Sequence, residues 1–121
     1  MIDLGKEIAK ITKELEQDAK RALEDAGEVA AKRAVTVLKE KAPRNQGRYA
    51  KGFRIKRELG PSGAKKFTVH SPHHYRLTHL LEFGHATRSG SRTRAFPHFK
   101  PAEEEAIKTY VEELEKKLSQ K

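Results

Sequence analysis

The stretch LLEFGHATRSGSRTRAFPHFKPA, residues 80–102, decides how this chain folds back on itself. It begins at the end of an apolar-rich pattern over residues 74–83. Gly84 follows that pattern directly, and a glycine there can adopt the left-handed conformation that closes a short helix. The sequence therefore predicts a short helix over residues 74–83, followed by a polar loop over residues 87–94.

The second half of the same stretch carries two prolines, Pro97 and Pro101. Each proline pushes the residue before it toward extended geometry, which predicts a short rigid strut over residues 98–100 with Phe99 as its anchor. Pro101 suits the first turn of a helix, where its missing N–H costs nothing. The acidic run that follows favours the positive end of the same helix. A last helix is therefore predicted over residues 100–118.

Towards the N-terminus, apolar residues recur three or four positions apart over residues 4–38, which predicts one long amphipathic helix. Its apolar positions change from Ile and Leu to Ala near residue 19, which permits close approach of another helix. A straight helix of this length would reach about 50 Å, beyond the diameter of a compact domain of this size. Either it bends near Gly27, or it projects and packs on another chain.

Between the long helix and the stretch 80–102, the pattern turns to strands. Ala42-Pro43 ends the helix, and residues 44–47 read as a turn. Residues 48–59 and 66–71 are candidate strands, joined by the hairpin loop GPSG. The predicted fold class is α+β, with a long N-terminal helix, a small antiparallel sheet, a short helix and a C-terminal helix.

Composition favours a single domain over residues 1–121, in which one section is strongly basic. Residues 1–41 are balanced, with nine Lys/Arg and nine Asp/Glu, whereas residues 42–100 carry thirteen against two and residues 101–121 carry four against six. The apolar share is only 36%, so part of the burial is expected to come from neighbouring subunits. There is no cysteine, which excludes disulfides and thiol chemistry, and no apolar run long enough for a membrane span. We expect a soluble protein made inside the cell.

Six histidines within thirty residues invite a metal or hydrolase interpretation: His70, His73, His74, His79, His85 and His98. Zinc hydrolases couple histidines at helical spacing with a carboxylate base. Here Pro72 separates the one pair that is four apart, and Glu58 and Glu82 are the only carboxylates of the basic section. We therefore expect surface or interface histidines, no metal, no cofactor and no catalytic residue, with Glu82 as a local ion-pair partner or interface residue.

The basic section also supports an alternative function, sequence-nonspecific nucleic-acid binding. Tyr49, Phe53 and Phe67 interleave with its cations, as a single-strand binder requires. No helix-turn-helix, zinc-finger or RNA-recognition motif is readable, and an acidic protein surface would suit the same cations. The candidate contact residues are Arg54, Lys56, Arg57, Lys65, Lys66, Arg88, Arg92 and Arg94.

Three marks in order make the chain resemble the gene-product-ten-like tail-component family of long-tailed bacteriophages. They are KAP followed by GRY at residues 41–49, LEFG at 81–84, and PHFKPA at 97–102. Gln46, His85 and His98 depart from the residues that are common in the family at these places.

The resemblance implies a structural, non-enzymatic subunit of a phage or prophage virion. Such subunits assemble as a homo-oligomeric ring, often sixfold, at the head–tail junction or tail end. The implied partners are copies of itself and the neighbouring head-connector and tail-tube proteins, with nonspecific DNA contact as a further option and no membrane. The expected location is the virion, after synthesis in the bacterial cytoplasm, and the loop with Arg88 is expected to order on assembly. The motif residues expected to shape the interface are Pro43, Gly47, Arg48, Glu82, Phe83, Gly84, Pro97, Phe99 and Pro101.

Overall fold

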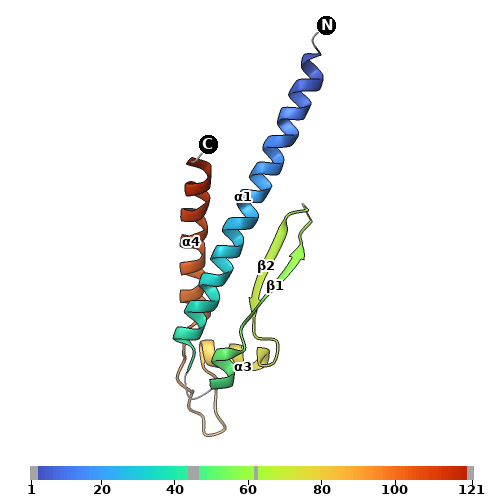
Figure 1. Ribbon diagram of the computed structural model, residues 1–121. Coiled ribbons are helices and arrows are strands. Elements are labelled where there is room, and N and C mark those ends of the chain that lie inside the picture. Colours follow the sequence, from blue (N-terminus) through green and yellow to red (C-terminus); the bar gives the residue numbers. More distant parts are fainter. Residues whose placement is uncertain (1–2, 44–46, 62, 120–121) are drawn as a thin grey trace.

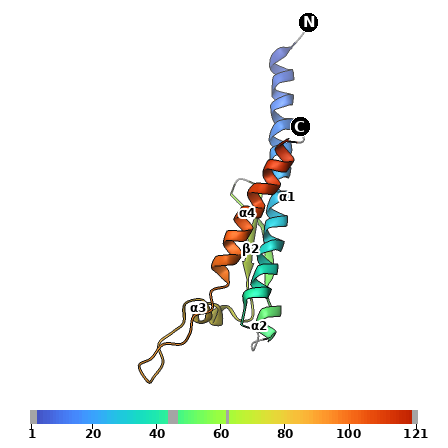
Figure 2. The same cartoon turned by 90° about the vertical axis from the view of Figure 1, so that its left-hand side faces the viewer.

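The computed structural model describes residues 3–43, 47–61 and 63–119, and its first element is one long helix, α1 (Leu4–Lys41; Figure 1). Asp3 caps the start of α1, because its side chain accepts a hydrogen bond from the Lys6 N–H at 3.0 Å. The predicted long helix is confirmed. It runs through Gly27 without a break, so α1 extends about 57 Å at 1.5 Å per residue. Its N-terminal half projects beyond every other element (Figures 1 and 2).

Gly27 provides a close approach rather than a bend. A Cβ atom at this position would lie 2.6 Å from Cε2 of the Phe67 ring, a distance that real Cβ atoms do not tolerate. The missing side chain therefore lets the sheet lie directly against α1, at the cost of a glycine's lower helix propensity.

Helix α4 (Phe99–Ser119) runs antiparallel to α1 and packs along its lower half (Figure 1). The alanines on α1 let the helices approach closely, and Ala26 and Ala30 are buried. Exposed ion pairs flank the contact, with Arg33 to Glu105 at 3.5 Å and Lys117 to Asp25 at 3.9 Å. Pairs this exposed contribute little, so packing of the small side chains holds the two helices together.

The antiparallel hairpin consists of β1 (Arg54–Leu59) and β2 (Lys65–His70). Its register pairs Ile55 with Val69 and Arg57 with Phe67, so these four side chains share one face. That face lies towards α1, since Phe67 reaches Gly27. The predicted hairpin and the α+β class are confirmed.

The strand predicted to begin at residue 48 is wrong in its first part. Helix α2 (Gly47–Lys51) occupies this segment, and the strand begins only at Arg54. The reason is the pairing of Tyr49 with Phe53, whose ring centroids lie 5.0 Å apart. Four residues of strand would separate these side chains by about 13 Å, whereas a helical turn brings them together. Residues 44–46 of the predicted turn lie outside the described residues.

The core sits at the lower end of the molecule, where α3 (Tyr75–Phe83) and α2 meet the ends of α1 and α4 (Figure 2). Its buried residues are Val37, Leu38, Ala42, Tyr49, Phe53 and Ala102. The division into one domain with three sections stays a prediction. The core is small because it lies at one end of an elongated molecule.

The projecting half of α1 carries four large apolar side chains that nothing in the described chain covers. They lie at spacings of four, three and four residues and are 53–66% exposed: Leu4, Ile8, Ile11 and Leu15. We call this set the α1 stripe. It continues the apolar face of α1 beyond the point where α4 ends.

Candidate functional site

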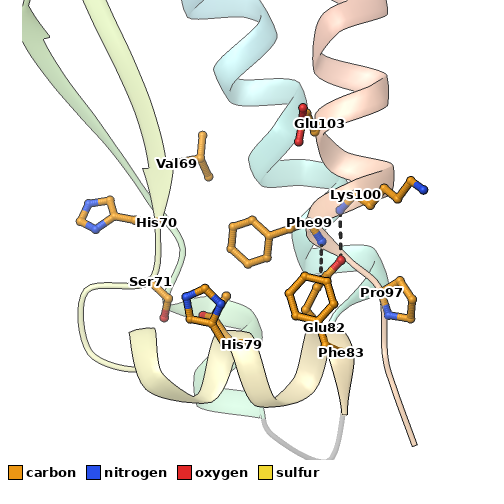
Figure 3. A pocket seen from close by; sticks show the side chains of 11 residues that line it. Val69, His70, Ser71, His79, Glu82, Phe83, Pro97, Phe99, Lys100 and Glu103 are labelled. Atoms are coloured by element: carbon orange, nitrogen blue, oxygen red, sulfur yellow. Dashed lines mark hydrogen bonds between the residues drawn. The ribbon is translucent and has the colours of Figure 1, made fainter. Parts of the chain in front are cut away.

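The site with the most structure around it is the junction between α3 and α4, which Glu82 organises. The Glu82 carboxylate accepts hydrogen bonds from the backbone N–H groups of His98 and Phe99 at 2.9 Å and of Lys100 at 3.2 Å. Figure 3 shows the bonds from Phe99 and Lys100. Pro101 has no N–H, and the Ala102 N–H bonds to the His98 carbonyl at 3.2 Å. Every N–H in the first turn of α4 is thereby satisfied, and the cap comes from another helix.

The charge of Glu82 suits this role. Burial by itself raises the pKa of the carboxyl group. The hydrogen bonds from the three backbone N–H groups, with a smaller electrostatic contribution from the adjacent His98 ring, outweigh burial and hold the pKa of Glu82 below its ordinary value. A charged carboxylate at a helix N-terminus also benefits from the helix dipole.

His98 lies in the core, contrary to the expectation of a surface or interface histidine. Its ring is fully buried, with Nδ1 2.7 Å from the Phe96 carbonyl oxygen and 2.9 Å from Glu82 Oε1. Because both neighbours accept hydrogen bonds, Nδ1 carries a hydrogen. Nε2 lies 2.5 Å from the Tyr49 hydroxyl.

The Tyr49 hydroxyl extends this network to α3. It lies 3.2 Å from Thr78 Oγ1, whose own hydroxyl donates to the His74 carbonyl at 3.3 Å. Burial raises the pKa of Tyr49, and the nearby Glu82 charge adds to the rise against the opposing hydrogen bond with Thr78, so the hydroxyl stays protonated. The polar chain therefore links α2, α3 and the start of α4 inside the core.

The strut predicted over residues 98–100 is wrong in its last two residues, because α4 already begins at Phe99. The Glu82 carboxylate takes the N–H groups that an extended strut would leave unpaired, which favours the early helix start. Pro101 lies in the first turn, as predicted. The predicted acidic run lies beyond that turn, and the acid at the helix start is Glu82 from α3.

Gly84 ends α3, as the sequence predicts, with a positive φ of 70°. Its ψ of 172° is extended, so the backbone is not in the left-handed helical conformation. A Cβ atom there would lie 2.6 Å from the Thr93 carbonyl oxygen, so the returning loop passes directly over this glycine. The Thr93 N–H donates to the His85 carbonyl at 2.8 Å, and the Phe96 N–H donates to the Leu81 carbonyl at 2.6 Å. The loop that these bonds close, residues 86–92, extends away from the body of the molecule (Figure 2).

An open apolar cavity of about 570 Å³ lies beside the junction, between the end of β2, α3 and the start of α4 (Figure 3). Val69, Phe83 and Phe99 form its apolar lining, and the Phe83 side chain is 69% exposed. Ser71 also lines it, and its buried hydroxyl has no hydrogen-bond partner among the residues that the structure describes. A cavity of this kind suits an apolar side chain from another segment better than a charged substrate.

The motif residues fall into two groups. Those from the second half of the chain meet at the junction: Glu82, Phe83, Gly84, Pro97, Phe99 and Pro101. Pro43 is buried after the end of α1, and Gly47 and Arg48 lie in α2. Their interface role stays a prediction.

The cations of the hairpin do not form one free surface. Arg57 binds both carboxylate oxygens of Glu28 on α1, with Nε to Oε2 at 2.9 Å, and its hydrogen bonds lower the pKa of Glu28. Arg54 donates to backbone carbonyls at 2.9 and 3.0 Å, and Lys56 lies 4.0 Å from Glu58. Lys65 and Lys66 are exposed. The cationic face is therefore smaller than its sequence count indicates.

The loop arginines are also engaged in part. The Arg94 guanidinium lies 5.3 Å from the centroid of the Phe96 ring, and Arg92 reaches the Phe83 and Gly84 carbonyls at 3.4 Å. Arg88 is exposed.

Nucleic-acid binding loses its predicted stacking platform, because Tyr49 and Phe53 are 1–2% exposed and Phe67 packs against Gly27. Phosphate contact by the remaining cations stays a prediction.

Sequence reasoning missed Tyr49 and His98 as a buried polar pair. The one available signal was the position of His98 between two prolines beside Phe99, and the sequence around Tyr49 gave no such signal.

Among the described residues, no three His, Asp or Glu side chains are grouped so that they could hold a metal ion. No helix in the described part of the chain combines the length and apolar character that a membrane span needs.

A family model described as "Bacteriophage HK97-gp10, putative tail-component" matches residues 3–84. The match covers α1, α2, both strands and α3. It contains the first two marks of the resemblance, whereas PHFKPA lies beyond it. Comparisons with curated proteins and with solved structures found no match.

Proposed function

Because the chain belongs to the HK97 gp10-like family of bacteriophage tail components, we propose that it is a structural subunit of a phage or prophage virion that acts by ring assembly. Its place in the particle is the head–tail junction or the end of the tail. There it contacts copies of itself and the neighbouring head-connector and tail-tube proteins.

The observation that carries this proposal is the α1 stripe on the projecting half of the helix. Short amphipathic helices are marginal in water on their own, and most of their stability comes from packing of the apolar face. Residues 4–18 of α1 have their apolar face open to solvent. A neighbouring subunit that covers this face would supply the missing packing.

A structural role also fits the chemistry at the junction. The one carboxylate that lines the cavity from α3 is Glu82, and three backbone N–H groups hold it as a helix cap. A carboxylate bound in this way is a poor general base, because the three hydrogen bonds fix its orientation and stabilise its charged form.

Particle composition tests the proposal. Phage particles from a host that carries this gene are expected to contain the chain in a fixed number of copies per tail, measured by quantitative mass spectrometry of purified particles. Disruption of the gene is expected to leave heads and tails unjoined or tails unfinished in electron micrographs, because a missing ring interrupts assembly. Normal particles that lack the chain would refute the proposal.

A further inference from the structure

The loop between α3 and α4 forms a short antiparallel ribbon that its own hydrogen bonds hold together. The Thr87 N–H donates to the Ser91 carbonyl at 2.8 Å, and the Gly90 N–H donates to the Thr87 carbonyl at 3.1 Å. Gly90 has a φ of 88°, which suits the last position of a three-residue hairpin turn. We call residues 85–94 the basic loop. It extends away from the body of the molecule, and most of its side chains are exposed (Figure 2).

One face of the basic loop carries two arginines. Ala86 pairs with Arg92 across the ribbon, and Arg94 shares the face of Arg92 because side chains two residues apart point the same way. The same register sets Gly84 opposite Arg94. The other side of the ribbon therefore contributes only small groups to this face, which leaves room around both guanidinium groups. Arg88 lies in the turn at the tip.

The other face carries hydroxyl groups. Thr87 Oγ1 lies 2.9 Å from Ser89 Oγ and from Ser91 Oγ, and the two serine oxygens are 3.3 Å apart. Thr93 continues this face two residues after Ser91. Hydroxyl groups donate hydrogen bonds to phosphate oxygens, as arginine side chains do. Both faces of the basic loop can therefore bind phosphate.

No carboxylate in the described part of the chain balances the charge of the basic loop. The sequence contains no Asp or Glu between Glu82 and Glu103. Arg88, Arg92 and Arg94 are exposed, and none of the ion pairs among the described residues includes them. Arg92 contacts backbone carbonyls and Arg94 contacts an aromatic ring. Such contacts orient the guanidinium groups and leave their charge available to an anionic partner.

We propose that the basic loop enters a groove of double-stranded DNA and binds the phosphates on both sides without reading the base sequence. The major groove of a duplex is about 12 Å wide and admits a two-stranded ribbon. Its two walls are sugar–phosphate backbones. The arginine face binds one wall, and the hydroxyl face binds the other.

The two faces distinguish DNA from an acidic protein surface. A protein surface contacts one face or the tip of a projecting ribbon, so the other face is left without an anion. A groove surrounds the ribbon and uses both faces. The inference adds DNA contact to the proposed structural role, and it does not depend on the formation of a ring.

Salt dependence gives the expected size of the effect. Each phosphate that a cation neutralises contributes about −0.9 to the slope of log K against log salt for duplex DNA. Three loop arginines therefore contribute about −2.7, which corresponds to about a 40-fold loss of affinity between about 50 and about 200 mM salt.

Two variants of the full-length chain test the contact. The loop variant carries three substitutions: Arg88→Gln, Arg92→Gln and Arg94→Gln. The matched control removes the same charge from α1, on the side opposite the α1 stripe: Lys6→Gln, Lys10→Gln and Lys13→Gln. Fluorescence anisotropy measures the binding of each protein to a short labelled duplex of mixed sequence, from about 50 to about 200 mM salt. Thermal unfolding curves check that both variants remain folded.

The loop variant is expected to lose more than about tenfold in affinity at about 50 mM salt and to have a salt slope that is shallower by about 2.7. The control is expected to stay close to the natural chain. An equal loss in both variants, or no binding of the natural chain at about 50 mM salt, would overturn the inference. Equal binding of a labelled single strand of the same length would also overturn it, because a single strand has no groove.

A protein partner for the basic loop would give a different result. The loop variant would then bind DNA as the natural chain does but would no longer self-assemble in sedimentation, and the inference would be wrong. Each of these failures leaves the proposed structural role standing, because particle composition tests that role separately.

Discussion

Replacing Glu82 with glutamine is expected to lower the free energy of unfolding by about 2–4 kcal/mol near pH 7, because charge-assisted hydrogen bonds to buried N–H groups are lost. The carboxylate of Glu82 serves three backbone N–H groups and the buried His98 ring at once. An amide retains one acceptor oxygen and turns an NH₂ group towards donors. Chemical denaturation measures the difference, with the exposed Glu103→Gln as the matched control.

The stabilisation that Glu82 provides is expected to depend on pH. The pKa of Glu82 is held below its ordinary value of 4.5 in the folded chain. The stability that its charge contributes is therefore fully present above pH 4.5 and is lost as the pH falls through the lowered folded pKa. The difference in free energy of unfolding between the natural chain and Glu82→Gln is expected to become smaller as the pH falls below 4.5. A difference that stays constant into the acid range would contradict the role of the charge.

Replacing Gly84 with alanine is expected to cost about 2–3 kcal/mol, from the positive φ and the close backbone contact together. The φ of Gly84 is 70°, and the added Cβ would meet the Thr93 carbonyl oxygen at 2.6 Å. That oxygen belongs to backbone held by the loop's own hydrogen bonds, so it cannot move aside alone.

Gly90 offers the matched control for this substitution. Its φ is 88°, yet no described residue lies within 4 Å of an added Cβ. Gly90→Ala should therefore carry only the conformational cost, about 1 kcal/mol. Chemical denaturation of both variants separates the two contributions. Equal losses would show that the close passage of the loop over Gly84 is not important.

The helices and the hairpin were predictable because local signals specify them. The spacing of apolar residues marks α1 and α4, Gly84 and Pro101 mark a helix end and a helix start, and the loop after residue 59 marks the hairpin. Helix α2 was missed because Tyr49 and Phe53 have the same spacing on one face of a helix or a strand. Only their burial against the core decides between the two.

The site was less predictable because its decisive contacts are long-range. Glu82 caps residues sixteen to eighteen positions away, and Tyr49 meets His98 across forty-nine positions. No local pattern encodes such partners. Likewise, the count of cations overstated the basic face, since Arg57 is bound to Glu28 on another element.

The central claim is that this subunit is incomplete alone and is finished by its own copies. Sedimentation velocity of the natural chain over a wide dilution series tests it most directly. The account predicts a discrete closed assembly at high concentration that dissociates to single subunits on dilution, because the α1 stripe gains its cover only in the assembly. A single 13.7 kDa species at every concentration would contradict the account.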